Sequence, residues 1–314
     1  MLFDGVAISL TILEIASSQK HAPRNDINFF MNEIEVKLPT PKEVLTVRPP
    51  KGWISLNLRD LWIYRELITF LTWRDILVRY KQTLLGASWA IINPVVNMLV
   101  LQFIFGNLAN MDTGGVPGPI FRYTALLPWM LFSQALNSSG RSMLSNRGLI
   151  TKVYFPRLVV PLSSVLSGVV DFAISLIVMI GMMIYYKVTV SWTLLTIIPL
   201  VILTLVVALG VGLWLAALNV LYRDVAYVLP VMTQMWLFLS PVGYSSATIP
   251  ENLQLLYALN PMTGVIEAFR WAFLGETTSI LGLQIAISVV IGLVLLVSGM
   301  FFFRRMERTF ADRI

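Results

Sequence analysis

The sequence contains no cysteine and a single histidine, His21, which lies in a polar N-terminal stretch. The absence of cysteine excludes disulfides and thiolate chemistry, and one tail histidine gives little basis for a metal site. The sequence also lacks the G-x-x-x-x-G-K-[ST] phosphate loop and any evident pairing of a nucleophile with a base. We therefore expect no catalytic residue and no cofactor on this chain, so ATP-driven work would require a partner subunit that binds ATP and Mg.

Charged residues are scarce as well. They make up 13% of the 314 residues, against roughly 25% in an average soluble domain. Hydrophobic residues reach 57%, and the mean hydropathy is +0.76. This composition indicates an all-α polytopic membrane protein. The net charge of +6 could also suggest nucleic-acid binding, so the positions of the cations decide what it means.

Six apolar runs are long enough to cross a bilayer, which takes about 20 helical residues. We expect transmembrane helices near 86–109, 120–139, 158–184, 193–217, 226–244 and 280–303. Between the last two, residues 249–275 form two apolar pieces that are split at Asn260-Pro261. Each piece is too short to span, which predicts two short extracytoplasmic re-entrant helices before the last span.

The chain before the first span divides into two parts. Residues 1–58 read as an N-terminal tail and linker, and residues 59–82 carry an apolar stripe at helical spacing. The stripe consists of Tyr64, Leu67, Ile68 and Leu71, and it is interrupted by Arg74 and Asp75. The pattern predicts an amphipathic helix in the cytoplasmic interface, followed by a transmembrane domain over 83–314. A surface helix of a soluble region is the alternative.

The cations fall mainly on one side of the expected spans. If the N-terminus is cytoplasmic, the opposite side receives only Arg122, Lys187 and Arg270. The cytoplasmic side receives the basic C-terminal tail and Arg59, Arg65, Arg74, Arg79, Lys81, Arg141, Arg147, Lys152, Arg157 and Arg223. This positive-inside bias predicts an inner-membrane protein with both termini in the cytoplasm. Because topology explains the charge, we expect no nucleic-acid partner.

The first span begins within "RYKQTLLGASWAIINP", residues 79–94. Arg79 and Lys81 read as anchors at the cytoplasmic interface, with Trp89 near the headgroups. One helical face, next to Pro94, is formed by Gly86, Ala90, Asn93 and Asn97. A small, polar, kinked face inside a membrane predicts either a helix–helix contact or the wall of a wet passage.

The third span carries polar residues at steps of four: Ser163, Ser167, Asp171 and Ser175. An aspartate near the middle of a membrane costs about 2.5–3.5 kcal/mol on an insertion scale, so Asp171 should face protein or water. Two interpretations remain open. Asp171 either forms part of a polar channel wall or gate, or it is a hydrogen-bonded strut between helices.

Aromatic and small residues give two further patterns. Candidates for an aromatic channel lining are Trp89, Trp129, Phe132, Trp214, Trp236, Phe238 and Tyr244. For each of them, the alternative is an interfacial belt or a place in the core. Ala208, Gly212 and Ala216 instead form a seam of small residues for close helix packing.

The same segments carry a family resemblance. "RYKQTLLGASWAIINP" resembles the start of the membrane domain in type-2 ABC exporter permeases of the polysaccharide group. The similarity continues through "TKVYFPRLVVPLSSVLSGVVDF", "LNVLYRDVAYVLPVMTQMWLFLSPVGY" and "LYALNPMTGVIEAFRWAFLG", and it covers about residues 55–310 in order. The N-terminal extension departs from the usual pattern.

This resemblance implies a six-span permease that works as a homodimer with two ATP-binding cassette subunits. It implies export of a lipid-linked polysaccharide, such as an O-antigen or a teichoic acid, through a channel at the dimer axis. One alternative is a type-2 exporter for a drug or a small lipid. Another is a membrane-embedded transferase on lipid-linked sugars, which would need acidic or histidine clusters at the ends of spans that the sequence lacks.

Two charged elements outside the spans complete the candidate sites. Glu267 and Arg270, at i and i+3, are expected to pair and to hold the short gate helix after Asn260-Pro261, with a solvated surface pair as the alternative. The cytoplasmic loop 140–157 has four cations and no acid, and a short helix ended by Gly148 is expected in it. The resemblance places a coupling helix there. Arg147 and Lys152 are the candidate contacts to the ATPase, and topology alone is the alternative explanation of their charge.

Overall fold

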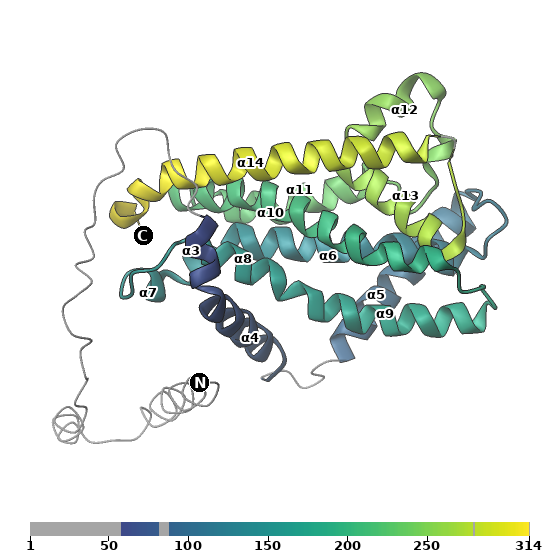
Figure 1. Ribbon diagram of the computed structural model, residues 1–314. Helices are drawn as coiled ribbons and strands as arrows, with labels where there is room; N and C mark the ends of the chain where they lie inside the picture. The colour runs from purple at the N-terminus through teal and green to yellow at the C-terminus, as the bar shows by residue number, and fades with distance from the viewer. Residues whose placement is uncertain (1–57, 82–87, 279, 314) are drawn as a thin grey trace. The chain divides into compact units, whose positions relative to one another are not determined.

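The computed structural model describes residues 58–81, 88–278 and 280–313, and throughout these ranges the chain forms helices and connecting turns without a β-strand. The expected tail and linker, and Gly86 of the first polar face, lie outside the described residues. The all-α fold class is therefore confirmed for the part of the chain that the structure describes (Figure 1).

The amphipathic segment before the first span forms two helices, α3 (Leu58–Ile63) and α4 (Arg65–Lys81), which meet at Tyr64. Its apolar stripe packs inward as expected. Leu71 is 1% exposed, and Leu67 and Ile68 pack against the same hydrophobic cluster. That cluster also contains Phe155, Leu213, Phe303 and Phe310, so the stripe anchors α4 to the rest of the bundle.

Four of the six expected spans are long and apolar enough to cross a membrane. They are Trp89–Leu108, Val159–Tyr185, Trp192–Leu221 and Leu281–Glu307. The first combines α5 (Trp89–Leu101) with the π-helical turn η2 (Gln102–Leu108). The second combines α8 (Val159–Leu166) with α9 (Gly168–Tyr185). The third consists of η3 (Trp192–Thr196) and α10 (Ile197–Leu221), and the fourth lies within α14 (Leu281–Arg313).

The other two expected spans are helical but do not meet those criteria of length and composition. Residues 120–139 lie within α6 (Gly118–Ser145), whose 28 residues include polar side chains such as Gln134 and Asn137. Most side chains of α6 are buried in protein, so this helix does not need an apolar surface all round. Residues 226–244 contain α11 (Val225–Phe238), which has only 14 residues. The count of six spans therefore remains a prediction.

The segment 249–275 forms the two short helices that the sequence predicts, α12 (Glu251–Ala258) and α13 (Pro261–Leu274). Asn260 separates them and caps α13, because its side-chain oxygen accepts a hydrogen bond from the Met262 amide over 3.1 Å. Pro261 occupies the first turn, where its missing N–H costs nothing, and Gly275 ends the helix with φ of 74°.

Small residues allow α10 to pack closely against α6 and α14. Figure 1 shows the ribbons of these helices running along the same bundle. A Cβ on Gly212 would stand 2.5 Å from the Ser139 hydroxyl of α6. A Cβ on Gly210 would stand 2.7 Å from the backbone of Leu295 and Leu296 in α14. Ala208 and Ala216 are fully buried, so the predicted seam of small residues is confirmed.

The loop after α6 contains one short helix, α7 (Arg147–Ile150). Gly148 lies inside this helix, so the expectation that Gly148 ends it is wrong. The turn 151–156 follows, and the next helix starts at Val159. In Figure 1, α7 lies at one end of the helix bundle and α12 lies at the other.

Candidate functional site

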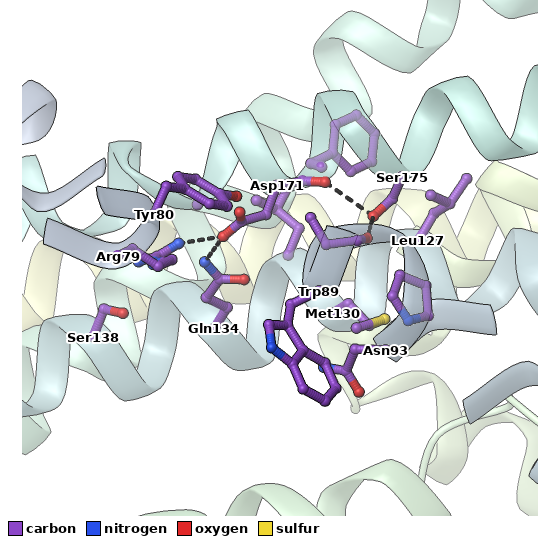
Figure 2. Close-up of a pocket in the computed structure, with 15 residues that line it drawn as sticks. Arg79, Tyr80, Trp89, Asn93, Leu127, Met130, Gln134, Ser138, Asp171 and Ser175 are labelled. Atoms are coloured by element: carbon purple, nitrogen blue, oxygen red, sulfur yellow. Dashed lines mark hydrogen bonds and ion pairs between the residues drawn. The ribbon is translucent and has the colours of Figure 1, made fainter. Parts of the chain in front are cut away.

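A polar cavity of about 430 Å³ lies between α4, α5, α6 and α9. Figure 2 shows Asp171 near its centre, where the carboxylate accepts hydrogen bonds from Arg79 of α4 and Gln134 of α6. Arg79 also donates to the Ser167 hydroxyl over 3.3 Å. The side chains of Arg79 and Asp171 are 32% and 16% exposed, so the ion pair is partly shielded from solvent.

The polar face of the span formed by α8 and α9 explains why Asp171 points into this cavity. Ser167 lies at the break between α8 and α9, and Asp171 follows in the first turn of α9. One turn later, the Ser175 hydroxyl donates to the Asp171 carbonyl over 2.9 Å. The face is therefore directed at α4, α5 and α6, which confirms that Asp171 faces protein and a polar cavity.

The partners of Asp171 were not foreseen. The sequence indicates an interfacial anchor at Arg79, whereas the structure pairs Arg79 with Asp171 of α9. Gln134 is the third member of this network, and no local sequence pattern pointed to it. The ion pair with Arg79 agrees with a strut between helices. The position of Asp171 in the cavity wall agrees with a role in a channel wall or gate. Both interpretations of Asp171 are therefore retained.

Two candidates from the first span accompany this network. Trp89, which is 52% exposed, and Asn93 line the same cavity. Asn97 lies one turn further along α5, and its side-chain amide donates to the Asn93 side-chain oxygen over 2.7 Å. Both asparagines are exposed on this chain. Trp89 and Asn93 thus lie within reach of Asp171, and Asn97 extends the polar strip along α5.

Three of the candidate aromatic residues, Trp129, Phe132 and Trp236, lie in or against the hydrophobic core. Trp129 and Phe132 are 5% and 0% exposed, and the Phe132 ring meets the Trp236 ring edge-on at 5.0 Å. Trp214 stacks on Phe302 with a ring separation of 4.1 Å and binds the Ser298 hydroxyl, which joins α10 to α14. In a single chain, these contacts agree with the core alternative rather than with a lining.

A second polar constellation lies in α13. Glu267 and Arg270 form an ion pair of 3.0 Å, with side chains 5% and 1% exposed. The predicted pairing is confirmed, and the alternative of a solvated surface pair is wrong. Burial lowers the pKa of Arg270, and the adjacent Glu267 carboxylate opposes that shift. Guanidinium stays protonated at any physiological pH, so Arg270 remains a cation.

The pair holds the turn between α11 and α12. Arg270 donates to the carbonyls of Pro241 and Val242 over 2.6 and 3.2 Å, and Glu267 accepts from the Ser246 amide over 2.9 Å. The Arg270 guanidinium also lies 3.9 Å from the centre of the Phe121 ring. The segment 241–246 is thereby bound to α13 at both of its ends.

Five further side chains extend the clamp formed by Glu267 and Arg270 toward α11 and α12. The Trp236 indole donates to the Asn260 side-chain oxygen over 2.9 Å, and Asn260 donates to the Ser240 hydroxyl over 2.9 Å. Tyr244 shares a hydrogen bond of 2.7 Å with the Tyr257 hydroxyl of α12. The sequence identified Asn260 only as a break, because nothing local indicates its long-range partners. Phe238 is exposed on α11.

The candidate coupling residues lie apart from both constellations. Arg147 begins α7, Lys152 follows it in the turn, and both are exposed. Arg157, at the end of the loop, binds the Glu307 carbonyl of α14 and lies over the Phe310 ring. The loop is thus fixed to the C-terminal part of α14, while Arg147 and Lys152 remain accessible.

Comparison with known proteins identifies the family. Residues 66–274 match the family model described as ABC-2 type transporter. The O-antigen export system permease protein RfbA of Myxococcus xanthus is 31% identical over 219 residues, which cover 69% of this chain and 83% of that protein. An RfbA protein of Klebsiella pneumoniae is 28% identical over 79% of this chain and 94% of its own length. The polysialic acid transport protein KpsM of Escherichia coli is 25% identical over 71% of this chain and 89% of its own length.

The matched region contains α4, the polar cavity and α13. The chain therefore belongs to the ABC-2 type transporter family, and its role is that of a membrane-spanning permease subunit.

Proposed function

We propose that this chain is the permease subunit of an ABC exporter that moves a lipid-linked, O-antigen-type polysaccharide out of the cytoplasm. The observation that carries the proposal is the similarity to O-antigen export permeases over most of the chain, at up to 31% identity. The polar cavity beside four helices supports it, because a glycan needs hydroxyl and amide partners that a purely apolar bundle lacks. A drug or small-lipid exporter is not favoured by these relatives.

The proposed topology has six spans, with both termini at the cytoplasmic face of the inner membrane. The 28 residues of α6 give a helix of about 42 Å, enough to cross a hydrocarbon core of about 30 Å. The sixth span would be α11 together with the turn that follows it. We propose that α4 lies in the cytoplasmic interface, since Trp62 and Trp73 are exposed on α3 and α4.

The short helices α12 and α13 are proposed as extracytoplasmic re-entrant elements. Neither has the length to span, and the Glu267–Arg270 pair binds α13 to the turn that follows α11. The clamp formed by Glu267 and Arg270 would hold the extracytoplasmic end of the channel in one conformation. Its buried position suits a gate that must stay rigid while a polymer moves past it.

A homodimer with two ATP-binding cassette subunits completes the proposal. Asn93 and Asn97 are exposed on α5, and amides directed at lipid would be costly. A second copy or a water-filled channel at the dimer axis would satisfy them. The energy would come from ATP and Mg bound to the partner, which α7 would contact through Arg147 and Lys152.

The test is export by the full chain together with its partner ATPase. Cells that make the glycan but lack their own permease should display it at the surface only when both chains are supplied. An ATPase variant without its phosphate-loop lysine serves as the control. Surface glycan that does not depend on this chain, or a complex that moves only drugs or phospholipids, would contradict the proposal.

A further inference from the structure

A second cavity, of about 280 Å³, lies among three turns and α13. Its lining residues come mainly from turns 112–114, 245–248 and 276–278, and from Glu267 and Arg270 of α13. These turns precede α6, α12 and α14, respectively. Figure 1 shows α12 and α13 at the end of the bundle opposite α7. In the proposed topology the cavity therefore opens at the extracytoplasmic face of the membrane.

The buried ion pair in its wall has hydrogen-bonding capacity left over. Hydrogen bonds from Ser246 and Arg270 both reach Oε1 of Glu267, and Oε2 has none within the residues that the structure describes. Arg270 uses its two Nη atoms, while its buried Nε has no hydrogen-bond partner in that part of the chain. Both side chains are almost fully buried. Because unpaired buried polar groups are costly, this wall favours a ligand that supplies both a donor and an acceptor.

The rim of the cavity adds further acceptors and hydroxyl groups. Asp112 and Glu276 contribute carboxylates, of which Asp112 accepts the Gly114 amide over 3.0 Å. Glu276 has neither a hydrogen bond nor an ion pair with any residue that the structure describes. Gly114 gives Glu276 room, since a Cβ on it would lie 3.1 Å from Glu276 Oε2. Hydroxyl groups come from Thr113, Ser245, Thr248, Thr277 and Thr278.

Charge distinguishes between the ligands that could bind these groups. An anion would meet the carboxylates of Asp112, Glu267 and Glu276. A metal ion would meet the Arg270 guanidinium, which stays protonated. The neighbouring hydroxyls of a sugar ring instead donate to carboxylates and accept from N–H and O–H groups. The volume of about 280 Å³ lies just below the roughly 300–1,000 Å³ of sites for drug-sized ligands, which suits a single ring.

We propose that this cavity binds one neutral hexopyranose ring on the extracytoplasmic side, with Glu267 and Glu276 as acceptors for its hydroxyls. The inference rests on the proposed function, which supplies both the orientation and a glycan. Arg270 Nε and the rim hydroxyls complete the shell as donors. The two side chains that clamp the turn 241–246 would thus also contact a sugar unit that leaves the channel.

Saturation-transfer NMR with D-mannose and D-galactose tests the site, using the full chain in phosphatidylcholine nanodiscs. We expect saturable transfer to at least one of the two hexoses. Glu276→Gln should weaken binding at least about threefold, because a charge-assisted hydrogen bond is roughly twice as strong as a neutral one. The matched control is Glu251→Gln, which changes an exposed carboxylate of α12 that does not line the cavity. It should leave the affinity within about twofold of the parental value.

Thr277→Trp tests the cavity by filling it. Thr277 is exposed at the rim, so the variant should keep the parental melting temperature and lose hexose binding. Asn252→Trp places the same side chain at an exposed position of α12 outside the cavity and should bind hexose as the parent does. All of these variants retain Glu267 and Arg270, so the clamp on the turn stays intact.

Absence of saturation transfer from the parent to either hexose would overturn the proposed site, as would parental affinity in either Glu276→Gln or Thr277→Trp. Loss of the hexose signal on addition of EDTA would also contradict it, because the carboxylates would then hold a metal ion. Each of these results is compatible with normal glycan export, which would leave the proposed function intact. Conversely, hexose binding that follows the variants in a protein that exports no glycan would contradict only the proposed function.

Discussion

Asp171 of α9 and Arg79 of α4 form an ion pair although they lie 92 positions apart in the sequence. Gln134 of α6 completes the contact, so a single carboxylate connects three helices. One of them is the proposed interfacial helix α4, and α9 belongs to the apolar span Val159–Tyr185. A shift of α4 relative to the bundle would therefore change the polar wall of the cavity directly.

Replacing Asp171 by Asn tests whether the charge itself matters. Asn retains the size and one oxygen acceptor but leaves Arg79 without its counter-ion, at a cost of about 1–3 kcal/mol for a partly shielded contact. We expect normal insertion and dimer assembly with reduced export, measured as surface glycan per assembled transporter. Arg79→Gln/Asp171→Asn removes both charges and should recover part of the loss. Parental export by Asp171→Asn would leave the residue with a structural role only.

The α13 clamp should be sensitive to loss of the cation. Arg270→Met would leave Glu267 buried without its partner and free two carbonyls of the turn, costing about 3–5 kcal/mol. We expect a clear drop in the melting temperature of the purified protein. Glu267→Gln keeps an acceptor for the Ser246 amide and should be milder. The prediction is wrong if both variants melt at the same temperature as the parent.

A double charge reversal at these positions should not restore function. Glu in place of Arg270 would direct a carboxylate at the carbonyls of Pro241 and Val242, where only a donor fits. We expect Glu267→Arg/Arg270→Glu to be as impaired in export as the single reversals. Recovery by the double variant would show that the ion pair matters more than the grip on the turn.

The coupling role of α7 predicts a defect in assembly with the ATPase. Arg147→Gln/Lys152→Gln removes two exposed cations and touches no part of the core. Insertion and dimerisation should be unchanged, while co-purification of the ATPase and export both fall. Arg59→Gln/Arg65→Gln removes the same charge and should behave as the parent. Parental co-purification and export by the first variant would exclude these two contacts.

Close packing of α10 on α14 predicts that alanine substitution destabilises the protein at Gly210 but not at Gly181. Gly210→Ala would place a methyl group 2.7 Å from the backbone of α14, forcing the helices apart at a cost of about 1–3 kcal/mol. Gly181→Ala in α9 meets no atom within 4 Å and should be neutral or slightly stabilising. Melting temperatures of the two purified variants decide the point, and equal values would contradict the packing argument.

Local patterns in the sequence were enough to specify the elements. Four spans, the two short helices around Asn260-Pro261, the small-residue seam on α10 and the inward stripe of α4 all follow from periodicity, length and capping. These features depend on neighbours within one or two turns, so the sequence contains the information in readable form. Length and composition did not suffice for α6, because burial in protein lets a helix carry polar residues that lipid would reject.

The tertiary structure alone decided which polar groups meet. Asp171 was recognised as a residue that must face protein or water, yet only the fold brings Arg79 and Gln134 to it from two other helices. Likewise, the i and i+3 spacing predicted the Glu267–Arg270 pair, but its burial and its grip on residues 241–246 depend on how α13 packs. Contacts between distant segments depend on the relative rotation and depth of whole helices, and the packing of the complete bundle determines both.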